Sequence, residues 1–127
     1  MKRILLFTGV TLLLLTGPDA LAQRSTEMYV PIGQSPGLSG KVTTIGTIDD
    51  VKLQEKVITC SYGSGSISAK ITPKTRIWLD RSKAKLPNSP GGFSDCTKGR
   101  RVEVKYVNND RRDGADADWV KVEITSQ

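Results

Sequence analysis

From residue 41 onward, apolar and polar side chains alternate with a period of two, which is the repeat of a strand with one buried face. The clearest case is the segment 66–72, in which Ile67, Ala69 and Ile71 alternate with polar neighbours. Val, Ile and Thr, which suit a pleated surface, are frequent here. The pattern predicts strands at 41–48, 55–62, 66–72, 75–80, 101–107 and 118–125, and no helix.

Turn-forming residues separate the predicted strands. Asp49-Asp50 marks the first turn, a Gly-Ser-Gly run at 63–65 the second, and Asp113-Gly114 the last. The segment 81–98 is a long loop that contains proline. Six short strands without a helix predict an all-β sandwich or barrel. A small five- to six-stranded antiparallel barrel is favoured, because closure removes sheet edges that so short a domain could hardly cover.

The first 22 residues have the three parts of a secretory signal peptide. A cationic start, Met1-Lys2-Arg3, precedes an apolar run at 4–15, and Ala20-Leu21-Ala22 supplies small residues for cleavage. An uncleaved anchor is the alternative, but the run is about 12 residues long and a membrane span needs about 20. The chain is therefore expected to be exported, either to a periplasm or out of the cell, with no transmembrane segment in its mature form.

Residues 23–40 read as an extended arm, and the barrel domain is expected at 41–127. The arm is rich in Pro and Gly and has one apolar cluster, at 28–32. This cluster could lie on the barrel's own surface or add to the sheet edge of a partner. An arm with no fixed position is the other interpretation.

The only cysteines are Cys60 and Cys96. Export places them in an oxidising compartment, which predicts a disulfide between them. It would close a loop of about 37 residues and stabilise the fold by ~3.8 kcal/mol on the chain-entropy model. Two buried free thiols are the alternative.

Composition argues against most enzymes. The chain has no His, which removes the commonest general base and metal ligand. Two cysteines alone cannot complete a zinc site. The acidic, Gly-containing stretch 109–118 reads as a polar turn rather than a calcium loop, because Arg111 would fall at a ligand position. No catalytic residue, metal or cofactor is therefore expected.

The motifs of the strands resemble a known group of proteins. They are, in order, Gly40 with the Val/Thr/Ile-rich strand after it, Val57-Ile58-Thr59, the ITPKTRI stretch at 71–77, GRRVEV at 99–104 and ADWVKV at 117–122. The order is similar to that of small exported bacterial β-barrel domains of unknown function, which are similar to the OB (oligonucleotide/oligosaccharide-binding) barrel. The resemblance covers roughly residues 40–125 and implies a fold, not an activity. The cysteine pair and the long basic loop depart from the pattern.

Positive charge and two tryptophans suggest a binding face. The chain carries 19 Lys and Arg against 13 Asp and Glu. Trp78 and Trp119 fall on the outward positions of their strands and are expected to be exposed, where they could stack on a sugar or a base. A second small cluster, in which Tyr29 and Ile32 of the arm cover them, is the alternative. The candidate ligand-binding residues are Arg76, Trp78, Arg101, Lys105, Trp119 and Lys121, and the basic loop adds Arg81, Lys83, Lys85, Lys98 and Arg100.

These features of the sequence suggest two alternative functions. The first is a non-enzymatic binding module whose basic, Trp-bearing face takes an anionic polymer or a saccharide. The second is a small envelope protein that docks on a larger protein partner through its arm or a sheet edge. Cytosolic nucleic acid is not expected as a partner, because export removes the chain from it.

Overall fold

The computed structural model of the protein describes residues 26–125. The predicted signal peptide and residues 23–25 lie outside this range. The all-β prediction is confirmed, because every element between residues 43 and 123 is a strand or a 3₁₀ turn. The strands are β1 (Thr43–Lys52), β2 (Val57–Tyr62), β3 (Gly65–Lys70), β4 (Arg76–Asp80), β5 (Ser89–Pro90), β6 (Arg101–Tyr106) and β7 (Ala115–Glu123).

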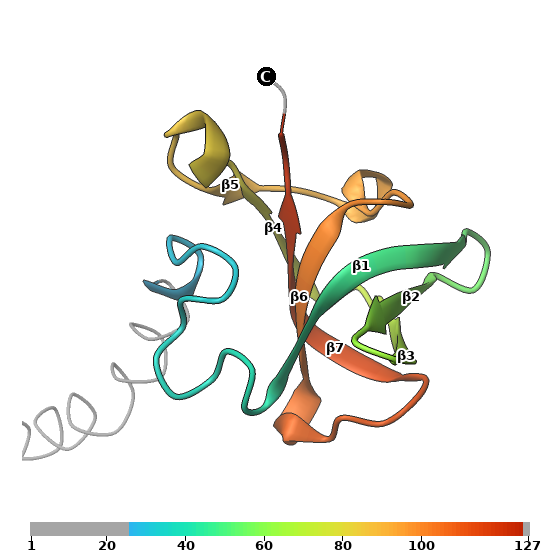
Figure 1. The fold of residues 1–127 in the computed structure, drawn as a ribbon. Helices are drawn as coiled ribbons and strands as arrows, with labels where there is room; N and C mark the ends of the chain where they lie inside the picture. Colours follow the sequence, from blue (N-terminus) through green and yellow to red (C-terminus); the bar gives the residue numbers. More distant parts are fainter. Residues whose placement is uncertain (1–25, 126–127) are drawn as a thin grey trace, which may run out of the picture.

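Five of the strands close into a barrel (Figure 1). The sheet runs in the order β3-β2-β1-β6-β7, and a parallel pairing of Ala69 with Ala115 joins β3 to β7 and completes the ring. Neighbours within the ring are otherwise antiparallel. A closed five-stranded ring is the architecture of an OB-like barrel.

The remaining strands lie outside the ring. β4 pairs in parallel with β7, placing Trp78 beside Lys121, and the two-residue β5 pairs with β4. The 3₁₀ turns η1 (Ser82–Ala84) and η2 (Phe93–Asp95) lie in the segment between β4 and β6. The expected long loop at 81–98 therefore contains short ordered elements, which position its side chains.

The first hairpin turns later than expected. β1 continues through Asp49 and Asp50 to Lys52, and the pairing with β2 shifts register between Ile48 and Asp50. Such a bulge bends a strand and increases its twist, so these two acidic residues bend β1 rather than end it. Earlier in β1, a Cβ on Gly46 would lie 2.1 Å from the carbonyl oxygen of Ser61. Glycine at this position therefore permits the close approach of β1 and β2.

The barrel core consists of the inward side chains that alternation predicted. Val102 and Val104 of β6 and Val120 and Val122 of β7 are fully buried. They pack with the inward residues of β1, β2 and β3 into one cluster. Among the described residues, no helix is long and apolar enough to cross a bilayer.

The expected disulfide is not formed. Cys60 and Cys96 are free thiols, buried in the barrel core at 1% and 2% exposure. Burial raises the pKa of each thiol to about 12. Both side chains belong to the barrel core cluster and pack there as small apolar residues.

Candidate functional site

The arm, residues 26–40, lies across the outer face of β4, β7 and β6, on the left of the barrel in Figure 1. Ile32 is 4% exposed, and beneath the arm Trp78 and Trp119 are 6% and 4% exposed. Their ring centroids lie 5.8 Å apart with the planes tilted by 39°. Both tryptophans lie on the outward side of the barrel, as predicted. Their expected exposure to solvent is wrong, because the arm covers that side. Ile32 takes part in this cover, whereas Tyr29 is 60% exposed.

Lys121 is the centre of a polar network under the arm. Its side chain is fully buried, and its Nζ lies 2.6 Å from Glu27 Oε1 and 3.0 Å from Ser35 Oγ. Nζ also lies 4.5 Å from the centroid of the Trp119 ring. The Ser35 hydroxyl donates a further hydrogen bond to Glu27. Lys121, a candidate ligand-binding residue, is therefore neutralised by the arm's own carboxylate.

Glu103 lies opposite Lys121 in the strand pairing and receives a second set of contacts. The backbone N–H of Gly33 donates to its Oε1 at 2.9 Å, and the hydroxyls of Ser39 and Thr43 donate to its Oε2 at 2.7 Å each. The side chain is fully buried. Three donors satisfy a carboxylate that no water reaches, so the turn from arm to β1 is anchored on β6.

Asp80 holds the middle of the arm at the end of β4. It accepts hydrogen bonds from the backbone N–H of Ile32 at 2.9 Å and of Ser82 at 2.8 Å. Burial alone would raise the pKa of Asp80, but the hydrogen bonds from Ser82 and Ile32 outweigh it and lower the pKa below its usual value. The ionised carboxylate is thus the form that binds the arm.

The other candidates on this face lie near acidic side chains. Arg101 Nη1 lies 3.8 Å from Glu123, and Lys105 Nζ lies 3.3 Å from Asp118. Arg76 is exposed at the start of β4 and borders a hollow of about 460 Å³ with Lys74, Asp116 and Asp118. Two basic and two acidic side chains border that hollow, so their charges offset each other and offer an anion no net attraction.

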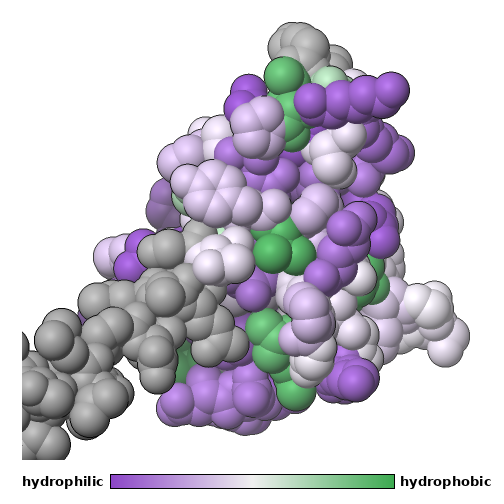
Figure 2. All heavy atoms as spheres, turned by 90° about the vertical axis from the view of Figure 1, so that its left-hand side faces the viewer, coloured by the Kyte–Doolittle hydropathy of each residue, from purple (hydrophilic) through white to green (hydrophobic). Residues whose placement is uncertain are grey.

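The structure does not gather the basic loop into one patch. Lys83 pairs with Glu123 at 3.4 Å. Arg81 and Arg100 donate to the backbone carbonyls of Pro87 and Asp95 in their own loop. Among the described residues, Lys85 and Lys98 have no acidic partner, and they lie on separate turns. Figure 2 shows the arm side of the molecule, where hydrophilic residues predominate and hydrophobic ones are scattered.

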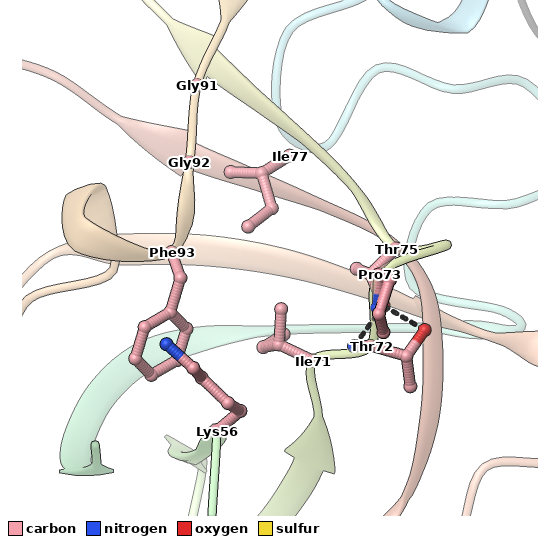
Figure 3. A pocket seen from close by; sticks show the side chains of 9 residues that line it. All are labelled: Lys56, Ile71, Thr72, Pro73, Thr75, Ile77, Gly91, Gly92 and Phe93. Atoms are coloured by element: carbon pink, nitrogen blue, oxygen red, sulfur yellow. Dashed lines mark hydrogen bonds between the residues drawn. The ribbon is translucent and has the colours of Figure 1, made fainter. Parts of the chain in front are cut away.

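A pocket of about 340 Å³ opens beside the barrel core, near the end of β3 and the start of β4 (Figure 3). Ile71 and Ile77, both core members, lie between the ring of Phe93 and the turn that carries Thr72 and Thr75. The remaining lining residues are Lys56, Pro73, Gly91 and Gly92. The lining is mostly apolar, with one cation.

Lys56 supplies that cation from the β1–β2 turn. Its Nζ lies 4.7 Å from the centroid of the Phe93 ring, and it has no ion pair with any described residue. Its backbone has φ of 59°, a left-handed conformation that lysine rarely adopts. The N–H of Ile71 donates to its carbonyl at 2.7 Å. This contact fixes the backbone of Lys56 next to the pocket.

Phe93 is held by a short, well-bonded turn. The Gly92 N–H donates to Asp95 Oδ2 at 2.8 Å, and the Cys96 N–H donates to the Phe93 carbonyl at 2.9 Å. The Gly91 N–H donates to the carbonyl of Ile77, which ties the turn to β4. The ring is partly buried against the barrel core. The aromatic wall of the pocket is therefore preformed.

Sequence reasoning missed both Lys56 and Phe93. Lys56 reads as an ordinary charge in a hairpin, and Phe93 as one apolar residue in a loop. Four strands, β2 to β5, separate the two residues along the chain, so no local pattern predicts their contact. The one available signal was Gly91-Gly92 before Phe93, which marks a turn at an aromatic residue.

No group of three or more potential metal ligands occurs among residues 26–125. Comparison with known proteins adds no relative: no family model, no curated protein and no solved structure matches this chain.

Proposed function

We propose that this protein is an exported, non-enzymatic binding module that takes an anionic ligand in the pocket between Lys56 and Phe93. The observation that carries the proposal is the position of the Lys56 ammonium group. This group stands over an aromatic ring at the edge of a preformed pocket and is not neutralised by any described residue. Small-molecule sites combine an apolar lining with a few fixed polar groups in this way.

Two other surfaces are less suited to the ligand. The arm covers the Trp-bearing face, and its Glu27 already forms an ion pair with Lys121. OB barrels often bind oligonucleotides or saccharides across their second and third strands. Here the outward side chains along those strands are aliphatic, hydroxyl or lysine groups, and the one exposed aromatic residue, Tyr62 at the end of β2, does not make a stacking platform on its own. These outward side chains are those of Val57, Thr59, Ser61, Ser66, Ser68 and Lys70.

The alternative, docking of the arm on a protein partner, has less support. Ile32 of the expected apolar cluster is buried against the chain's own barrel, and Glu27 is bound to Lys121. An arm that is occupied within the molecule offers a partner mainly its exposed Tyr29.

The proposal is tested by an NMR titration of the protein purified from an exporting host. The anionic ligands are a heparin tetrasaccharide, a trigalacturonate and octanoate. Binding of at least one, with shifts at the amides of Gly91, Gly92 and Phe93, supports the proposal if Lys56→Asn weakens it. Asn tolerates the left-handed backbone of this position, so the variant removes the charge without straining the turn. Lys52→Asn, in the same hairpin but outside the pocket, is the control. Absence of shifts at those amides with all three ligands contradicts the proposal.

A further inference from the structure

We infer that the ligand of this pocket is an amphiphile: an apolar chain or ring that carries one anionic group. The inference rests on the proposed function and narrows it, since it favours a carboxylate with a hydrocarbon body over an anionic saccharide. The inference depends on which side chains line the pocket and on whether their polar atoms already have hydrogen-bond partners.

The floor of the pocket is hydrocarbon. Ile71 and Ile77 are each 8% exposed and belong to the barrel core, while Phe93 and Pro73 border the opening. A ligand that lies here removes apolar surface from water on both sides of the contact, which is favourable in proportion to the area covered. A sugar hydroxyl in the same place would lose its hydrogen bonds to water.

The hydroxyl groups of the pocket are already used. Thr75 Oγ1 donates to the Ala117 carbonyl at 2.7 Å and accepts from the Thr72 N–H at 2.9 Å. Thr72 Oγ1 lies 3.3 Å from Thr75 Oγ1 and accepts from the Lys74 N–H at 3.1 Å. These bonds stabilise the turn between β3 and β4. A saccharide would find few unengaged partners there for its hydroxyls.

One positive group remains, and its position suits one anionic head. Lys56 Nζ lies over the Phe93 ring rather than in the apolar floor. Lysine is a compact point charge with three donors, which matches a single carboxylate or phosphate better than an extended polyanion. An apolar body against Ile71 and Ile77 with its anionic head at Lys56 uses every kind of group that the pocket offers.

The test compares octanoate, octanol and trigalacturonate by NMR titration of the same protein, at concentrations at which octanoate stays monomeric. Octanoate is expected to shift the amides of Gly91, Gly92 and Phe93 and to bind about fivefold more weakly to Lys56→Asn, as for a partly exposed ion pair. Lys56→Arg, which keeps the charge, and Lys52→Asn, which removes a charge elsewhere, should bind like the unmodified protein. Phe93→Leu keeps an apolar side chain but removes the ring, and should weaken binding several-fold.

Each other outcome overturns a defined part of the account. Octanol binding as tightly as octanoate, or octanoate binding that Lys56→Asn leaves unchanged, overturns the role of the anionic head. Trigalacturonate binding in the pocket without octanoate binding overturns the amphiphile and leaves the proposed function standing. If no anionic ligand, heparin tetrasaccharide included, shifts these amides, both fail.

Discussion

Lys121 and Glu27 are 94 residues apart in the chain, and their charged groups meet at 2.6 Å beneath the arm. Lys121 is fully buried, and the Glu27 side chain is 11% exposed. The pair joins the start of the described chain to its last strand. It also closes the Trp-bearing face that the sequence suggested as a binding surface.

Removing one partner of this pair should destabilise the protein. Lys121→Met leaves the Glu27 carboxylate buried without its cation, and breaking such pairs lowers the free energy of unfolding by about 3 kcal/mol. The midpoint of thermal unfolding should fall by more than about 10 °C. Urea denaturation measures the free energy of unfolding, and a thermal scan measures the midpoint. The double variant Glu27→Gln, Lys121→Met should recover part of the loss, and a Lys121→Met protein as stable as the unmodified one would show that the pair contributes nothing.

The arm should shield the two tryptophans from solvent. They are the only tryptophans in the chain, so fluorescence reports on this face alone. Acrylamide should quench the unmodified protein weakly and the Ile32→Asp variant several times more strongly, because a buried, unpaired carboxylate disfavours the docked arm. Gln34→Asp, at an exposed position of the arm, is the matched control. Equal quenching of Ile32→Asp and Gln34→Asp would contradict the role of Ile32.

The cysteines should behave as buried thiols. Cys60 and Cys96 should react slowly with a thiol reagent at pH 8 in the folded protein and rapidly once it is unfolded in urea. Addition of a reductant should leave the thermal midpoint unchanged. A midpoint that falls on reduction would instead support the disulfide predicted from the sequence.

Stability should decrease at high pH. Burial raises the pKa of both thiols from 9.0 to about 12 and also raises the pKa of Tyr106. The folded state therefore binds protons more tightly than the unfolded state. The contribution of these groups to the free energy of unfolding is complete below about pH 9 and is lost as the pH rises toward 12. Urea unfolding between pH 7 and pH 11 measures this, and the Cys60→Ala, Cys96→Ala variant should lose less stability over the interval. A flat profile in the unmodified protein would contradict the assignment.

Local patterns were sufficient for six of the strands but not for the short β5 or for the strand ends. Period-two alternation places Val102 and Val104 inward and Trp119 outward, as observed, because inward and outward positions are a property of each strand alone. The end of β1 was misplaced at Asp49-Asp50. A bulge lets two acidic residues continue a strand, and its presence depends on the pairing with β2.

The sites needed information that the sequence pattern lacks. Exposure of Trp78 and Trp119 depends on where the arm lies, and the arm is placed by contacts of Ile32 and Glu27 with distant strands. The Lys56–Phe93 pocket likewise depends on how the β1–β2 turn meets η2. Such contacts depend on tertiary packing, which no short window of the sequence contains.

The central claim is that a ligand enters between Lys56 and Phe93 and not at the tryptophan face. A single NMR titration with octanoate can follow both places at once, through the amides of Gly91, Gly92 and Phe93 and the indole N–H signals of Trp78 and Trp119. The account predicts saturable shifts of the three amides while both indole signals stay in place. Shifts of the indole signals with unchanged pocket amides would contradict it.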